Sequence, residues 1–405
     1  MWNPFGPPSL DGFVKLLFNE LAKAGKPTNY AYDPNEQSLT RGNTKMSLAG
    51  VYSTYCHASR ALRPAILNNY LAAMVATESP EGVPLEEVRD QIVAGVREEA
   101  MLTSAGFFVN SDQPTAMTGP AREPLSRWFV RTLIIDHPGH MALVSNDQLK
   151  RWNLTFDEAF AIGLERLRQG TTPAFAEKGG VYTGTWKDDY DSSRILVPGL
   201  FDDLPIEGDP IVVLPNRLTL LVADSAKPES VRRMLARAEE IVRSEPRPHN
   251  PAPLRLHDGQ IEDYVVSADS PIFQAVQRAH GLAALMYYQD QQQLLESYYE
   301  KVGKDYHVAK FTLNQRDDGT YFSSTVWTKD VSALVPEADF VTLVDLDRPE
   351  GKRVLGIVPW GTAKAVMAAQ MLDTRMFPTR YFVSTFPSAG QMREMGLGET
   401  TATGT

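Results

Sequence analysis

The chain has 405 residues, of which 43% are hydrophobic and 22% are charged, and its formal net charge is −10. This length predicts two or three domains, and the composition is that of a globular protein and excludes a largely disordered chain. The acidic balance and the lack of a dense lysine and arginine cluster argue against nucleic-acid binding, because proteins of that class usually carry a basic patch for phosphates.

The chain contains a single cysteine, Cys56, so it cannot form an intramolecular disulfide or a zinc site built on several cysteines. The N-terminal residues lack the basic and apolar regions of a signal peptide. No apolar run approaches the length of about 18 residues that predicts a membrane span. We therefore expect a cytoplasmic protein without a transmembrane segment.

Residues 1–115 are predicted to form a mainly helical N-terminal region. Apolar residues at helical spacing indicate a first helix from about Leu10 to Ala24. Because its polar face carries only Lys15 and Lys23 as cations, we favour packing in a core over attachment to a membrane surface. The other elements expected here are a hairpin over 30–39, helices over 47–76 and 84–102, and a linker over 103–124 with one strand over 107–109.

Residues 116–266 are predicted to form a central α+β domain. An almost continuous apolar run from Trp128 to Ile135 indicates a strand that is buried on both faces. Thr155 and Glu158 have the spacing of a capping box, so we expect a helix to begin directly after Thr155. The remaining elements expected here are strands over 141–144, 181–186, 211–214 and 218–223, a short helix over 192–196, a helix over 228–243, and a hairpin that turns at 258–259.

Residues 267–397 are predicted to form a second α+β domain, and the tail 398–405, rich in threonine and glycine, to be disordered. The elements expected in the second domain are one long helix or two helices over 272–302, a strand pair around 317–319, strands over 340–344, 354–358 and 381–386, and a helix over 362–372. Hairpins and helices occur in blocks instead of alternating. This order favours an α+β fold with mixed sheets over a doubly wound parallel sheet.

Several motifs, taken in order over residues 10–266, are similar to those of the YtpQ-like family of bacterial proteins, a domain of unknown function. They are Phe13-Val14-Lys15-Leu16-Leu17, Val51-Tyr52-x-x-Tyr55-Cys56, Trp152-x-Leu154-Thr155, Tyr190-Asp191-x-Ser193-Arg194-Ile195-Leu196 and Pro215-x-Arg217-x-x-Leu220. The resemblance implies a bacterial cytosolic α+β protein and no particular activity. Residues beyond 266 extend past the resemblance as an added C-terminal domain.

The densest polar motif contains Asp188, Asp189 and Asp191. Three carboxylates at this spacing suit a divalent cation, because Mg²⁺ often uses one or two carboxylates together with water. In the alternative, which we favour, Asp191 caps the short helix, Arg194 pairs with a neighbouring carboxylate, and Asp188 and Asp189 are solvated turn residues. A divalent cation is the one cofactor that the sequence suggests.

Two other groups of residues have the composition of a site. Asp136, His137 and His140 lie around a predicted turn, where they suit acid–base chemistry or metal binding, but a turn is also a natural place for exposed histidines. Cys56 and His57 are adjacent, and because adjacent helical residues point in different directions we favour a buried structural cysteine. The sequence contains no GxGxxG or phosphate-binding loop, no GxSxG elbow and no HExxH motif.

Tyr287 and Tyr288 mark an aromatic-rich stretch of the predicted long helix. Because basic residues do not alternate with these rings, the stretch does not favour stacking on nucleic acid and suits a core or a protein interface. With Arg194, these tyrosines are the residues that we expect to take part in binding. The sequence therefore predicts a non-enzymatic protein that binds a protein partner or itself, and the alternative is a metal-dependent hydrolase or transferase that uses the aspartates.

Overall fold

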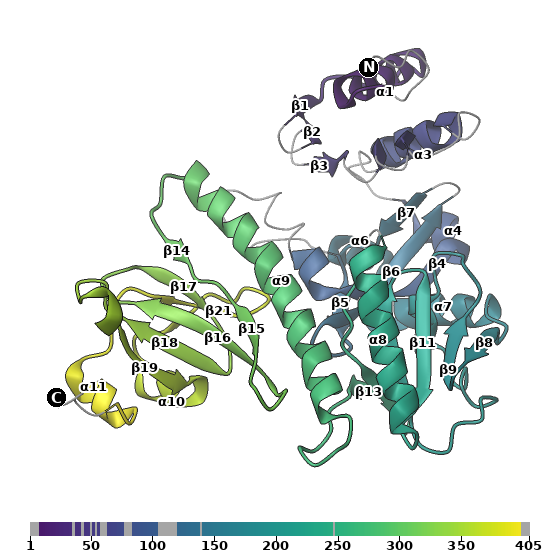
Figure 1. The fold of residues 1–405 in the computed structure, drawn as a ribbon. Coiled ribbons are helices and arrows are strands. Elements are labelled where there is room, and N and C mark those ends of the chain that lie inside the picture. The colour runs from purple at the N-terminus through teal and green to yellow at the C-terminus, as the bar shows by residue number, and fades with distance from the viewer. Residues whose placement is uncertain are drawn as a thin grey trace, which may run out of the picture. The chain divides into compact units, whose positions relative to one another are not determined.

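The computed structural model describes residues 8–34, 37–41, 44–48, 51–52, 55–56, 63–76, 83–103, 120–137, 140–245 and 248–397. Helices and mixed sheets occur in blocks along the chain (Figure 1), which confirms the α+β class. The chain divides into two compact units, one of residues 1–97, 105–124 and 130–172 and the other of residues 98–104, 125–129 and 173–405. These units do not follow the predicted domain ranges, because residues 173–266 group with the C-terminal residues.

The first unit begins with a small core around helix α1 (Leu10–Lys23). The side chain of Ser9 accepts a hydrogen bond from the Gly12 N–H at 3.2 Å and caps the helix, and its apolar stripe, including Phe13 and Leu17, is fully buried. This burial confirms core packing for the first helix. The other elements of this core are the antiparallel strands β1 (Ala31–Asp33), β2 (Ser38–Arg41) and β3 (Thr44–Ser47) and the helix α3 (Arg63–Ala76).

A second sheet is organised around strand β6 (Phe129–His137), whose buried apolar run confirms the predicted strand. A capping box starts helix α7 (Phe156–Gln169) as predicted, because the Thr155 hydroxyl accepts from the Glu158 N–H and the Glu158 carboxylate accepts from the Thr155 N–H at 2.8 Å. The other elements here are β4 (Ile92–Glu98), β5 (Arg122–Pro124), β7 (His140–Leu143), α4 (Leu85–Val88), α6 (Asn146–Trp152) and the 3-10 helix η1 (Arg89–Gln91).

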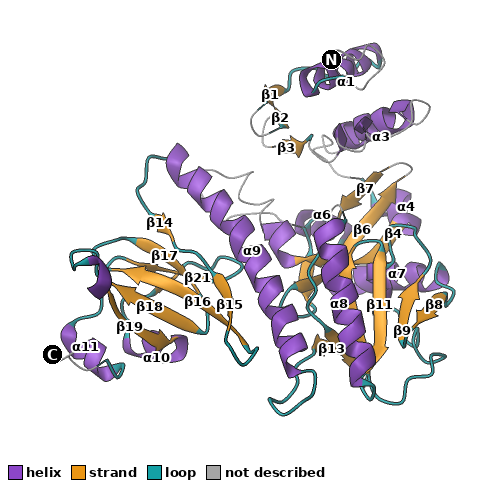
Figure 2. Cartoon of the chain, in the orientation of Figure 1, coloured by secondary structure: helices purple, strands orange, loops and turns teal. Residues whose placement is uncertain are grey.

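The second unit contains an antiparallel sheet with the strand order β13-β12-β10-β11-β9-β8. Figure 2 labels β8, β9, β11 and β13 of this sheet. Its strands are β8 (Phe175–Lys178), β9 (Val181–Gly184), β10 (Pro210–Asn216), β11 (Thr219–Asp224), β12 (Leu254–His257) and β13 (Gln260–Asp263), and η2 (Ser192–Leu196) is a 3-10 helix. Helices α8 (Pro228–Ser244) and α9 (Phe273–Lys301) share one apolar core with this sheet, in which Ile211, Val231 and Val276 are buried.

The C-terminal part of the second unit contains two four-stranded sheets, ordered β14-β17-β21-β20 and β15-β16-β18-β19. Each is mixed, because β16 pairs in parallel with β18 and β14 pairs in parallel with β17. Their shared core is built around Trp327, which is 1% exposed. The elements are β14 (His307–Val308), β15 (Thr312–Gln315), β16 (Tyr321–Thr328), β17 (Ala333–Pro336), β18 (Phe340–Val344), η3 (Glu350–Lys352), β19 (Val354–Pro359), α10 (Trp360–Val366), β20 (Leu372–Asp373), β21 (Arg380–Val383) and α11 (Ala389–Glu394).

The structure corrects one predicted helix. Residues 84–102 were expected to be helical because Val88, Ile92 and Val96 recur at helical spacing, but the helix ends at Val88 and residues 92–98 form strand β4. Every residue of β4 is buried. A strand that is buried on both faces is continuously apolar, and such a run satisfies a helical period by chance.

Smaller corrections concern boundaries. Ser47 ends a strand instead of starting a helix, and the helix expected over 362–372 ends at Val366, so that Leu372 lies in strand β20. The predicted strand over 107–109, the turn residues Pro138 and Gly139, and the tail 398–405 lie outside the described residues. No helix within the described ranges combines the length and the apolar character needed to cross a membrane.

Candidate functional site

The three aspartates of the polar motif have separate positions around η2. Both carboxylate oxygens of Asp188 accept from the guanidinium of Arg194, at 2.6 and 2.5 Å, and this pairing lowers the pKa of Asp188. Asp189 is exposed, and its carboxylate lies 4.0 Å from the guanidinium of Arg217. The predicted pairing of Arg194 with a neighbouring carboxylate is therefore confirmed.

Asp191 is fully buried and accepts hydrogen bonds from the backbone N–H groups of Lys187 and Asp188, at 3.1 and 3.3 Å. Burial raises the pKa of Asp191. Its side chain makes no capping bond to η2, so the predicted helix cap is wrong: the carboxylate closes the preceding loop instead. Lys187 and Asp189 in this loop have positive φ angles of 57° and 69°, and the Asp191 carboxylate helps hold this conformation.

Arg194 was expected to take part in binding, but it is 2% exposed and its guanidinium lies 4.6 Å from the centroid of the Trp186 ring. Together with Asp188 this stacking fixes Arg194 inside the fold. Among the described residues, no group of three or more histidine, cysteine, aspartate or glutamate side chains has a geometry that suits a metal ion. The arrangement favours the structural alternative for the aspartates.

The other sequence candidates are on the β6–β7 hairpin and between β3 and α3. His137 pairs with His140 across the β6–β7 hairpin, and Asp136 pairs with Met141. Cys56 is half-buried instead of fully buried, and His57 lies outside the described residues.

The two tyrosines of α9 have different surroundings. Tyr287 is 5% exposed, and its hydroxyl donates to Glu98 Oε1 and accepts from Asn250 Nδ2 at 2.6 Å. Burial raises the pKa of Glu98 from its ordinary 4.5 to about 7, although the hydrogen bond from Tyr287 opposes this rise. Glu98, Tyr287 and Asn250 therefore form a buried polar group in which one carboxyl titrates near neutral pH.

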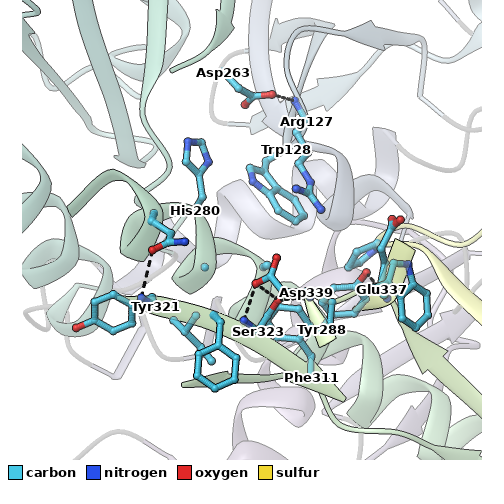
Figure 3. A pocket seen from close by; sticks show the side chains of 18 of the residues that line it. Arg127, Trp128, Asp263, His280, Tyr288, Phe311, Tyr321, Ser323, Glu337 and Asp339 are labelled. Atoms are coloured by element: carbon cyan, nitrogen blue, oxygen red, sulfur yellow. Dashed lines mark hydrogen bonds between the residues drawn. The ribbon is translucent and has the colours of Figure 1, made fainter. Parts of the chain in front are cut away.

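Tyr288 lines a cavity of about 910 Å³ beside α9 (Figure 3). This volume lies in the upper part of the range of ligand pockets, about 300–1,000 Å³. Its apolar and aromatic lining consists of Trp128, Val265, Val266, Phe273, Val276, Ala284, Tyr288, Phe311, Leu313, Tyr321, Phe322, Ala338, Trp360, Phe377 and Pro378. Aromatic walls with a few polar groups are the usual composition of a binding site.

One face of α9 provides much of the cavity wall, because Phe273, Gln277, His280, Ala284 and Tyr288 recur at helical spacing and all line the cavity. The opposite wall comes from β15 and β16 and from the loops at 337–339 and 377–379. Adding a Cβ to Gly281 would bring it within 2.6 Å of Leu313 Cδ1, so a glycine is needed where α9 approaches β15.

The buried Arg380 connects α9 to the C-terminal sheet. It is fully buried, and its guanidinium donates to Gln291 Oε1 at 2.6 Å and to the carbonyl oxygens of Ala309, Leu334 and Tyr288 at 2.7, 3.0 and 3.2 Å. Burial lowers the pKa of Arg380 to about 10, although the negative charge of Glu296 opposes this fall. The wall of the cavity is thus fixed by polar contacts behind it.

The polar groups of the cavity are held in place by the fold. Asp339 Oδ2 accepts from the backbone N–H and the hydroxyl of Ser323, at 2.7 and 2.8 Å (Figure 3). His280 Nε2 lies 2.8 Å from the carbonyl oxygen of Tyr264 and is the protonated nitrogen, and burial lowers the pKa of His280, which keeps the ring neutral at pH 7. Asp263 Oδ2 accepts from the N–H of Arg127 at 3.0 Å.

The sequence contained no local signal for this cavity. Its lining comes from segments that begin near Arg127, Asp263, Phe273, Glu337 and Phe377, and no two of them form a short motif. Only the tyrosine pair on α9 was singled out, as an interface or a core, and Tyr288 has a place in the lining. Comparisons of the chain with models of protein families, with curated proteins and with solved structures gave no match.

Proposed function

We propose that this chain is a non-enzymatic protein that binds a segment of another protein in the cavity beside α9. The cavity itself carries the proposal: a volume of about 910 Å³ with aromatic walls can accommodate the apolar anchor side chains that dominate protein interfaces. Trp, Tyr and Phe supply large contact areas at interfaces.

The hydrogen bonds inside the cavity support a preformed binding site. Asp339 and Tyr288 each use their polar atoms to hold neighbouring backbone, at Ser323 and Thr379. They hold the walls in one shape, and preorganised walls favour affinity.

We also propose a cytoplasmic location and membership in the YtpQ-like family, which rest on the sequence alone.

The test blocks the cavity at a position with room for a side chain. Gly361 lines the cavity, and a Cβ added there meets no atom within 4 Å. Gly351, outside the lining, has the same free space and serves as the matched control. The tagged full-length protein, Gly361→Phe and Gly351→Phe are each used for affinity capture from the native cells, followed by mass spectrometry.

We expect a stoichiometric partner with the parent protein and with Gly351→Phe, and its loss with Gly361→Phe. A partner that all three proteins retain equally would remove the cavity from the proposal. An empty capture with the parent protein would contradict protein binding. Urea unfolding of each variant confirms that the blocked protein is still folded.

A further inference from the structure

The charges that line the cavity are unequal. Three carboxylates, of Asp263, Glu337 and Asp339, face one guanidinium, of Arg127, while His280 is neutral at pH 7 because burial lowers its pKa. The cavity is therefore acidic on an apolar background. Electrostatic complementarity across an interface selects a partner of the opposite sign.

Asp339 is the carboxylate that the fold leaves uncompensated. Glu337 has the Lys364 ammonium at 3.6 Å, whereas no lysine, arginine or histidine lies within 4 Å of the Asp339 carboxylate in the described part of the chain. The two hydrogen bonds from Ser323 hold Asp339 Oδ2 in place while the side chain remains exposed. A cation that bound here would meet a carboxylate whose orientation is already fixed, so little side-chain entropy would be lost.

Aromatic rings share the cavity with this carboxylate. Tyr288, Phe311 and Phe322 line the same cavity, and Figure 3 shows Tyr288 and Phe311 in the same region of the cavity as Asp339. Rings of this cavity already accept guanidinium groups: Arg127 lies 4.7 Å from the centroid of the Trp128 ring and Arg316 lies 4.5 Å from that of Phe322. A carboxylate beside aromatic faces is the chemistry that binds an arginine or lysine side chain.

We infer that the segment bound in this cavity is basic and apolar, with an arginine or lysine side chain against Asp339 and apolar side chains on the aromatic walls. This inference rests on the proposed function and gives it a ligand class. The cation pairs with Asp339, whereas the Lys364 ammonium offsets the charge of Glu337. An acidic segment is disfavoured because like charges would be brought together in an apolar site.

The probe is a set of fluorescein-labelled octapeptide pools that differ at one central position. The other positions are drawn from leucine, phenylalanine, alanine and serine, and the central residue is arginine, lysine, its neutral analogue citrulline, or glutamate. Binding to the full-length protein is measured by fluorescence anisotropy. We expect the arginine and lysine pools to bind about tenfold more tightly than the citrulline pool, the effect of one charge-assisted hydrogen bond.

Asp339→Asn removes the charge and keeps an oxygen that accepts from Ser323, so the fold of the loop is retained. We expect this variant to bind the arginine and citrulline pools equally. Asp317→Asn changes the same charge at an exposed aspartate outside the cavity lining and should retain the tenfold preference. A preference that survives in Asp339→Asn, or a parent protein that prefers the glutamate pool, would overturn the inference.

The Gly361→Phe protein separates the two proposals. If this variant binds none of the pools and the parent protein binds every pool with the same affinity, the cavity binds peptides. Only the inference that the bound segment is basic is then wrong. If the parent protein binds no pool, or if Gly361→Phe binds all pools like the parent, the proposed function fails as well.

Discussion

At the scale of single residues, the buried group of Glu98, Tyr287 and Asn250 links the stability of the second unit to pH. Glu98 is 8% exposed and its pKa is about 7 in the folded protein, against an ordinary value of 4.5. Between these two values the folded chain keeps a proton that the unfolded chain has released. The stability that Glu98 contributes is therefore fully present below pH 4.5 and is lost as the pH rises through 7.

Glu98→Gln should remove this pH dependence, because the glutamine amide oxygen still accepts from the Tyr287 hydroxyl but does not ionise. The free energy of unfolding of the parent protein, relative to that of the variant, should fall by about 3 kcal/mol between pH 5 and pH 8. Urea unfolding at intervals of pH measures this difference. Glu300→Gln, at an exposed glutamate, is the control and should follow the parent curve. Parallel curves for the parent and Glu98→Gln would disprove the role of Glu98.

Asp188 allows a direct choice between the structural and the metal interpretation of the aspartate motif. Asp188→Asn weakens both hydrogen bonds to the buried Arg194, so we expect a loss of about 2 kcal/mol in the absence of any metal. Asp189→Asn, at an exposed position 4.0 Å from Arg217, should change stability by less than about 0.5 kcal/mol. Urea unfolding gives both values, and thermal unfolding with Mg²⁺, Mn²⁺ or Zn²⁺ completes the test. If a metal raises the unfolding temperature of the parent protein but of neither variant, the metal hypothesis would be restored.

At the scale of elements, sequence patterns predicted the helix starts and turns that depend on a few neighbouring residues. The capping box of Thr155 and Glu158 placed the start of α7, and Asp258-Gly259 placed the turn between β12 and β13, where both residues have positive φ angles. The failure at β4 has a physical reason as well. Ile92 to Val96 is apolar throughout because both faces of the strand are covered, and without alternation the sequence does not distinguish a strand from a helix.

Gly281 tests the packing of α9 on β15. Gly281→Ala places a methyl group 2.6 Å from Leu313 Cδ1, so the leucine must move, and the gain in helix propensity does not offset the strain. We expect a net loss of about 1 kcal/mol in urea unfolding. Gly361→Ala, where the added carbon meets no atom within 4 Å, is the control and should not be destabilised. A stabilised Gly281→Ala protein would mean that the two elements are less closely packed than described.

At the scale of the whole molecule, the cavity shows what one sequence cannot predict. Asp339 and Tyr288 line one cavity, and Arg380 joins α9 to β17, the strand that leads into the loop with Asp339. Neither the spacing of Asp339 in the chain nor its residue type indicates a site. The buried arginine gives no pattern either, because its acceptors are mostly backbone carbonyl oxygens from distant segments.

The domain boundary predicted at residues 266 and 267 also belongs to this scale. The core between the six-stranded sheet and α8 includes Ile272, Val276 and Ala279, which are 2%, 3% and 5% exposed and come after the boundary. Burying one isoleucine or valine side chain stabilises a fold by about 1.5–3 kcal/mol. A chain cut at 266 loses two such side chains, a large part of a typical net stability of about 5–15 kcal/mol.

We therefore expect a protein of residues 1–266 to lose cooperative unfolding of residues 173–266, with weak near-ultraviolet circular dichroism and no sharp urea transition. The full-length Val276→Ala protein, which removes one contributor and keeps α9, should still unfold cooperatively with a loss of about 2 kcal/mol. If the 1–266 protein unfolds as sharply as the full chain, the predicted boundary is a true domain boundary, and α9 packs against a core that is already complete. If it does not, α9 is a structural part of both the sheet core and the cavity wall, and deletion of residues 267–397 cannot by itself locate a binding surface.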